Sequence, residues 1–99
     1  ILDIEVEKGI TEIDIIHENI AKEVHFNSSY TWSYTSWDVK RKDVPTIVFD
    51  TINQNYATYS IDDIEYKESA DGSKVYIFEL EQGANEIHVT VDIEGNIVK

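Results

Sequence analysis

Apolar and polar residues alternate along most of the chain with a period of two, which is typical of half-buried β-strands. In residues 1–7, Leu2, Ile4 and Val6 alternate with acidic residues. The same pattern recurs after turn sequences that contain glycine or asparagine. It predicts strands at residues 1–7, 10–16, 20–26, 30–35, 60–68, 74–81, 86–93 and 97–98. Because short turns join most of these segments, we expect an antiparallel meander.

One segment has the period of a helix instead. Val44, Val48, Ile52 and Tyr56 recur at i, i+4 spacing, and polar residues fall mostly on the other side. Asp43 precedes this stripe and can cap a helix that carries a proline in its first turn. The pattern predicts an amphipathic helix of about three to four turns. A meander with one helix packed on a face is an α+β fold.

Two parts of the chain resemble each other. The segments IEVEKGITEIDI and FELEQGANEIHV are each a strand, a glycine turn and a strand when Gly9 is aligned with Gly83. We interpret the chain as about one and a half copies of a helix-then-meander repeat. It would form one domain over residues 1–99, with a truncated first repeat (1–26), an aromatic joint strand and linker (27–43) and a second repeat (44–99).

The interpretation as repeats has a structural consequence. If the helix of the first repeat is missing, part of one sheet face should lack a cover. A missing segment, a partner chain or a swapped homodimer could fill that face.

Composition narrows the function classes. The chain has 99 residues, of which 41% are hydrophobic, and this is enough for one modest core. Its formal charge of -12 repels phosphate backbones and anionic lipids, so we expect neither nucleic acid nor membrane insertion. No apolar run approaches the about eighteen residues that a membrane span needs. The absence of cysteine excludes disulfides, thiolate metal sites and cysteine nucleophiles.

The histidines carry no catalytic signature. His17, His25 and His88 lie in predicted strands or turns, and no G-x-S-x-G elbow is present. Glu23 and His25 could point the same way in one strand, but a zinc site needs at least one more ligand, and the histidine spacing does not supply it. We therefore expect no catalytic residues, no metal site and no cofactor.

Two acidic glycine turns are candidates for calcium sites. The segments SADGS (69–73) and DIEGN (92–96) lack the spaced oxygen ligands of an EF-hand, so ordinary hairpin turns are expected. Weak binding of divalent cations through the acidic charge stays open.

The stretch FNSSYTWSYTSWDVKRKD (26–43) is the most distinctive part of the sequence, because it holds both tryptophans and a basic cluster. Its aromatic residues alternate with hydroxyl residues, which predicts a strand with one aromatic face. That face is either core beneath the helix or an exposed binding surface, and a mixture of both is also open. The candidate binding surface consists of Tyr30, Trp32, Tyr34, Trp37, Lys40 and Arg41.

Residues 44–99 resemble a PepSY-like repeat. That pattern has a proline-started helix, a strand with an Ile-x-x-Ile-Glu segment, a D-G hairpin, a Tyr-x-Phe-Glu-Leu strand and a closing Asp-x-x-Gly-Asn. The matching positions are Pro45, Tyr59, Ile61, Ile64, Glu65, Asp71, Gly72, Tyr76, Phe78, Glu79, Leu80, Asp92, Gly95 and Asn96. Residues 1–26 are similar to a truncated first copy, in which Asn19 stands where a glycine is usual.

The chain thus resembles the β-lactamase-inhibitor-like, PepSY-like proteins, which are similar in fold to β-lactamase inhibitor protein (BLIP) and occur chiefly among exported proteins of gut Bacteroidetes. The resemblance implies helices on one face of a curved sheet, a periplasmic or secreted location and no catalytic residues. Our hypothesis is a non-enzymatic exported binding module that offers its sheet to a protein or peptide, for example as an inhibitor of a hydrolase or peptidase. The alternative is a structural or cation-sequestering envelope protein.

Overall fold

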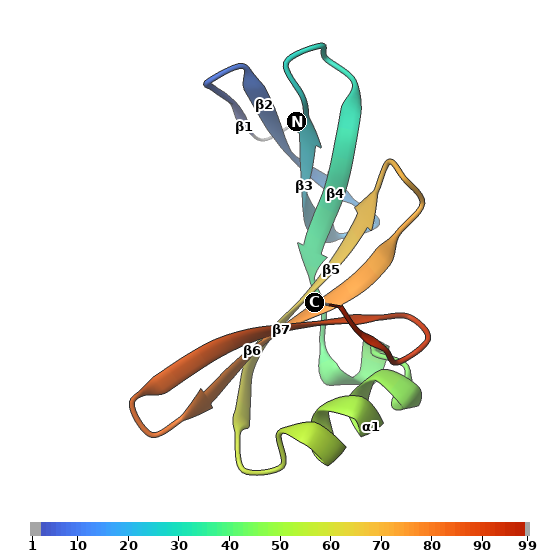
Figure 1. Ribbon diagram of the computed structural model, residues 1–99. Coiled ribbons are helices and arrows are strands. Elements are labelled where there is room, and N and C mark those ends of the chain that lie inside the picture. The colour runs from blue at the N-terminus through green and yellow to red at the C-terminus, as the bar shows by residue number, and fades with distance from the viewer. Residues whose placement is uncertain (1–2, 99) are drawn as a thin grey trace.

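The computed structural model describes residues 3–98, so Ile1 and Leu2 of the first predicted strand and Lys99 lie outside the described residues (Figure 1). Over this range the chain forms an α+β fold with one eight-stranded antiparallel sheet and one α-helix, as the alternation predicts. The elements are β1 (Asp3–Glu7), β2 (Ile10–His17), β3 (Ile20–Phe26), β4 (Trp32–Asp38), η1 (Arg41–Asp43), α1 (Thr46–Asn55), β5 (Ser60–Ser69), β6 (Lys74–Gln82), β7 (Asn85–Asp92) and β8 (Ile97–Val98).

The strands follow one another across the sheet in chain order, from β1 to β8. Two-residue turns at Lys8–Gly9 and Glu18–Asn19 join β1 to β2 and β2 to β3, and all four residues have positive φ, as type I′ hairpin turns require. Asn19 thus adopts the left-handed conformation, with φ of 65°, where a glycine is usual. Figure 1 shows that the sheet twists strongly, so that β3 and β4 run at a large angle to β6 and β7.

The strand register gives the sheet two chemically different faces, because paired residues of neighbouring strands project to the same side. On one side lie apolar residues of all eight strands, and we call it the helix face because α1 packs on it. Representative members of the helix face, one from each strand, are Ile4, Ile13, Val24, Trp37, Tyr66, Tyr76, Val91 and Ile97.

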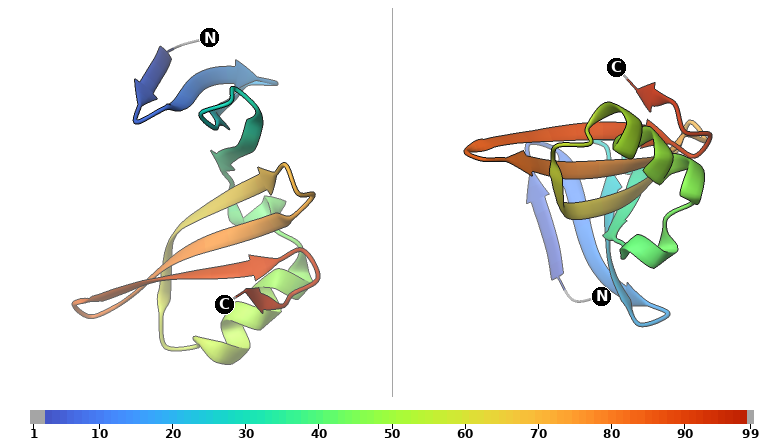
Figure 2. Two further views of the ribbon diagram at one scale, coloured as in Figure 1. Left: turned by 45° about the horizontal axis from the view of Figure 1, so that its top comes forward. Right: turned by 90° about the horizontal axis from the view of Figure 1, so that it is seen from below.

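The opposite side of the sheet is largely polar, and we call it the open face. Among the described residues, no helix covers it (Figure 2). In β1 to β5 its members include Glu5, Glu12, Asp14, Glu23, His25, Tyr34, Ser36, Asp38, Glu65 and Lys67.

The hydrophobic core lies between α1 and the second half of the sheet. Val48 and Ile52 of α1 are buried, and Val44 joins them from the segment before the helix. They pack with apolar residues of β5, β6 and β7, where the Phe49 ring meets the Phe78 ring edge-on at 5.9 Å. The buried strand residues are Ile64, Tyr76, Phe78, Leu80, Val89 and Val91.

The first half of the helix face has no such cover. Ile4 is 55% exposed and Val6 is 67% exposed, although both share a face with the core. Both views of Figure 2 show α1 beside β6 to β8 and away from β1 and β2. The expectation that part of one sheet face is uncovered is therefore confirmed for the described residues.

The predicted start and length of the helix need correction. Asp43 ends the short 3-10 helix η1 and does not cap α1, whose N-cap position is Pro45 with an extended ψ of 142°. The proline therefore precedes the helix instead of lying in its first turn. At the other end, Tyr56 caps the helix by donating its N–H to the carbonyl of Ile52 at 2.8 Å. The helix has ten residues, fewer than three to four turns would contain.

We predict that Gly95 is required to seat the helix. A Cβ at this position would lie 2.9 Å from Ile47 Cγ1 and 3.2 Å from the Ile47 carbonyl oxygen, and the Gly95 carbonyl accepts a hydrogen bond from Thr51 Oγ1 at 2.5 Å. Gly72 has an equally positive φ but open space around it. By denaturant unfolding, Gly72→Ala should cost about 1 kcal/mol from backbone strain. Gly95→Ala should cost about 1–3 kcal/mol more because of the clash, and equal costs would contradict this account.

Candidate functional site

The structure separates the predicted aromatic surface into three places. Phe26 pairs with Trp32 and His25 pairs with Tyr34, which leaves Ser33 as an extra residue in a β-bulge. The bulge shifts the alternation, so that Trp32 lies on the helix face and Tyr34 on the open face. The prediction of one aromatic strand face was therefore wrong.

Contacts of these side chains agree with the bulge. Trp32 Nε1 donates a hydrogen bond to Thr35 Oγ1 at 2.9 Å on the helix face. The Tyr34 ring stacks on the His25 ring with centroids 4.1 Å apart, and Lys67 Nζ lies 4.2 Å from the Tyr34 centroid. Tyr30 lies in the turn before β4, not in the strand, and is 78% exposed with φ of 59°.

Trp37 and Lys40 line a groove on the helix face. The groove has a volume of ≈ 460 Å³, within the range of small-ligand sites. The Tyr66 ring lies between the rings of Trp37 and Tyr76, at centroid distances of 4.9 and 5.0 Å. Lys42 also lines the groove, whereas Arg41 is exposed in η1. The sequence gives no local sign that Trp37 meets these two tyrosines, because the three residues come from three different strands.

The two tryptophans are packed differently, and their removal should show it. Trp37 is half-buried, contacts the Tyr66 ring and has Lys22 Nζ 4.2 Å from its centroid. Trp32 lies at the uncovered end of the helix face. We predict that Trp37→Ala lowers the free energy of unfolding by about 1–3 kcal/mol, less than for a fully buried tryptophan, and that Trp32→Ala costs under about 1 kcal/mol. Denaturant melts measure both, and a larger loss for Trp32→Ala would contradict the placement.

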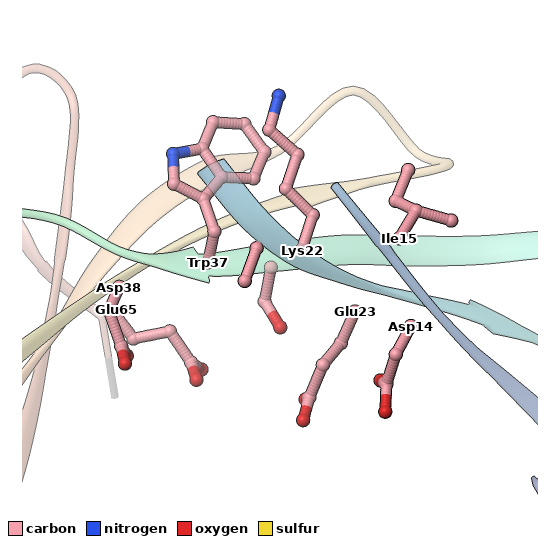
Figure 3. A pocket seen from close by; sticks show the side chains of 9 residues that line it. Asp14, Ile15, Lys22, Glu23, Trp37, Asp38 and Glu65 are labelled. Carbon is pink, nitrogen blue, oxygen red and sulfur yellow. The ribbon is translucent and has the colours of Figure 1, made fainter. Parts of the chain in front are cut away.

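The open face carries a row of carboxylates across β2 to β5. Asp14 pairs with Glu23, and Asp38 pairs with Glu65. Figure 3 shows these four side chains pointing to the same side of the sheet, while Ile15, Lys22 and Trp37 point to the other side. They border a depression of ≈ 290 Å³ in which Ser36 is buried. We call Asp14, Glu23, Asp38 and Glu65 the acidic row.

The acidic row is electrostatically strained. Partial burial raises the pKa of Glu65, and repulsion from Asp38 and Glu23 raises it further. Asp38 also has a raised pKa, first because of partial burial and then because of Asp63 and Glu23. Raised pKa values on neighbouring carboxyls mean that ionising all of them at neutral pH costs free energy. A bound cation would recover that free energy.

A second group on the same face contains metal-ligating atoms. His25 Nε2 lies 3.4 Å from Glu12 Oε1 and 3.6 Å from Glu23 Oε2. Glu12 is a third candidate ligand that the sequence did not reveal, because it stands opposite His25 on another strand. A comparable group of Glu79, Glu86 and His88 lies on β6 and β7.

The two acidic turns are hairpin turns held by their own aspartates. Asp71 Oδ1 accepts the Ser73 N–H at 2.9 Å, and Asp92 Oδ1 accepts the N–H groups of Glu94 and Asn96 at 2.9 Å each. These backbone hydrogen bonds lower the pKa of both aspartates. The carboxylates of Asp71 and Asp92 thus accept hydrogen bonds that stabilise their own turns.

The raised pKa values of Asp38 and Glu65 give a signed prediction of stability against pH. A carboxyl whose folded pKa exceeds its unfolded value binds more protons in the folded state, so its contribution to stability falls as pH rises. For Asp38 and Glu65 this contribution is full below their unfolded values of 3.8 and 4.5 and is lost as pH rises through the raised folded values. Glu65→Gln should therefore raise the melting temperature at pH 7 and reduce its fall between about pH 4.5 and 7.

The matched control for this prediction is Glu94→Gln, which removes the same charge from an exposed turn residue outside the acidic row. Thermal melts over the same pH series compare the two variants. An equal gain from both would assign the effect to net charge instead of the acidic row.

With this geometry established, comparisons place the chain in a family. A family model described as "Putative beta-lactamase-inhibitor-like, PepSY-like" matches residues 10–99. The chain therefore belongs to this family, as the resemblance indicated. No curated protein sequence matches it significantly.

Solved structures share the fold at low sequence identity. A DUF2874 family protein from Bacteroides ovatus superposes with a TM-score of 0.87 at 17% identity, over 98% of this chain and 72% of that chain. A BLIP-like protein from Bacteroides fragilis gives 0.85 at 18% identity, over 98% and 70%. A protein of Bacteroides eggerthii described as one of the "putative periplasmic proteins" gives 0.85 at 11% identity, over 98% and 73%. At these identities the likeness shows the fold alone.

Within residues 3–98, the helices are too short and too polar to cross a membrane.

Proposed function

We propose that this protein is a non-enzymatic, exported binding module that holds a positively charged segment of a protein or peptide on the open face of its sheet. The acidic row is the observation that carries the proposal. Its four carboxylates come from four adjacent strands and share one depression. Their repulsion is relieved when lysine or arginine side chains of a partner lie between them.

The ordered strands around the acidic row also support binding on the open face. Strand residues hold each carboxylate at a register position, and Ser36 is buried in the floor between Glu23 and Lys67. A surface that is already ordered loses little conformational entropy on binding. Tyr34 adds an aromatic ring beside the acidic row, and tyrosine is frequent at binding hot spots.

Of the predicted surface residues, only Tyr34 belongs to this proposed site. Trp37, Lys40 and Arg41 lie at or beside the groove on the helix face, and Tyr30 and Trp32 lie toward the β3–β4 turn. We assign Trp37 to packing in the uncovered half of the helix face, where a further segment or partner can complete the cover.

The family supports an inhibitor-like role and an exported location. A solved relative is called BLIP-like, and another is described among periplasmic proteins. We propose that the partner is a hydrolase or peptidase with a basic rim, and that residues 1–26 and 44–99 derive from two copies of one repeat. Both repeats have a hairpin with a positive-φ glycine, Gly9 in one and Gly83 in the other.

A second candidate function is favoured by the same carboxylates. A structural envelope protein that sequesters small cations would use the acidic row without a defined protein partner. The two roles differ in the size of the ligand, so that competition between a peptide and a simple divalent cation separates them.

The test is a binding titration with a fluorescein-labelled oligolysine peptide, followed by fluorescence anisotropy at low and physiological salt. We predict that Asp38→Asn/Glu65→Gln weakens binding about tenfold, because two charge contacts at the surface together supply about 1–2 kcal/mol. Binding should also weaken with salt, since the contacts are screened.

The control is the double variant Asp50→Asn/Glu94→Gln, which removes the same charge from exposed positions outside the open face. It should bind within about twofold of the parent chain if the acidic row is the site. Equal losses in the two double variants would contradict the proposed face. Displacement of the peptide by millimolar calcium would favour the cation-sequestering role.

A further inference from the structure

His25 has an unusual position on the open face. Its side chain is only 13% exposed, and its Nε2 atom is buried without a hydrogen-bond partner. Buried polar atoms in folded proteins almost always have a partner, so an unpaired one requires an explanation. Asp14 Oδ1, one strand away on the same face, is also buried and unpaired.

The distances around His25 fit metal ligands better than hydrogen bonds. Nitrogen-to-oxygen hydrogen bonds are about 2.7–3.2 Å long, whereas Glu12 Oε1 and Glu23 Oε2 lie 3.4 and 3.6 Å from Nε2. Two ligands about 2.0–2.1 Å from a tetrahedral zinc ion are about 3.3–3.4 Å apart. The ligand atoms of Glu12, Glu23 and His25 all lie within 4.8 Å of one another.

The register explains why these three side chains converge. Glu12 stands directly opposite His25 in the β2–β3 pair, and Glu23 is two residues from His25 on the same strand. Stacking of the His25 ring on the Tyr34 ring, at 4.1 Å and 17° between planes, fixes the imidazole orientation. Such support of a ligating histidine by its neighbours is what tunes metal sites.

We propose that Glu12, Glu23 and His25 form a zinc-binding site, with water at the fourth position. Imidazole nitrogen and carboxylate oxygen are both zinc ligands, whereas calcium prefers six to eight oxygen ligands. The zinc site shares Glu23 with the acidic row. The proposal is tested apart from the peptide-binding function through His25 and Glu12, which lie outside the acidic row.

A second histidine group in the molecule provides the contrast. His88 Nε2 lies 3.9 Å from Glu86 Oε1, and the histidine side chain is 61% exposed. No aromatic ring stacks on His88 among the described residues. This group has the same residue types as Glu12, Glu23 and His25, but its histidine is exposed and no aromatic ring in the described part of the chain orients the imidazole. It therefore serves as a matched control.

The experiment is a zinc titration of the full chain, free of any polyhistidine tag, by isothermal titration calorimetry at pH 7 with excess magnesium to saturate unspecific acidic sites. We expect one zinc ion per chain. His25→Gln and Glu12→Gln should each weaken binding by at least about 10–100-fold, the loss typical of changes around a metal. His88→Gln should bind as the parent chain does.

Cobalt supplies a second readout, which reports the coordination geometry of the bound ion. A tetrahedral cobalt complex in the parent chain and in His88→Gln, lost in His25→Gln, would support the site through its visible absorption. Melts of each variant without metal check that the fold is kept, and the near-isosteric Glu12→Gln remains informative if His25→Gln is destabilised. Absence of zinc binding in the parent chain, or binding lost in His88→Gln but kept in Glu12→Gln, would overturn the proposal.

Discussion

The packing of one helix on half of a continuous apolar sheet face is the constraint on which the rest of the structure depends. The register carries apolar residues across the helix face from β1 to β8, but α1 reaches only the second half. All nine buried hydrophobic residues of the described chain lie between Val44 and Val91. Because burial of apolar surface is the main stabilising term, the second half of the sheet anchors the first. The β-strands of the first half are held chiefly by backbone pairing.

The same alternation that builds the core creates the open face. In β1 to β5, most apolar residues on the helix face have acidic or polar neighbours along their strand, and those neighbours gather on the other side. With a net charge of -12, the chain concentrates like charges there, and at Asp38 and Glu65 of the acidic row partial burial adds to the repulsion in raising the pKa. We therefore propose that the open face binds a partner, whereas the helix face serves to pack the core under α1.

Much of this architecture was predictable from local patterns. The meander and the core were predicted because they depend on neighbours in sequence. These local signals are strand alternation, turn residues such as Gly72 and the i, i+4 stripe of α1. The bulge at Ser33 did not, because strict alternation predicts no inserted residue, and it moved Tyr34 to the other face. The acidic row could not be predicted from neighbours in sequence, because its members come from four strands: Asp14, Glu23, Asp38 and Glu65. Only the pairing register brings them together, and it likewise adds Glu12 to His25.

The most direct measurement of the central claim is a carbon-detected NMR titration of the side-chain carboxyl groups, with and without the cationic peptide. If the open face is a strained anionic surface that a cation relieves, Asp38 and Glu65 should titrate above ordinary carboxyls in the free chain. Their pKa values should then fall when the peptide is bound. Unchanged pKa values for both residues on binding, with the shifts located instead at Asp50 or Glu94, would contradict the account.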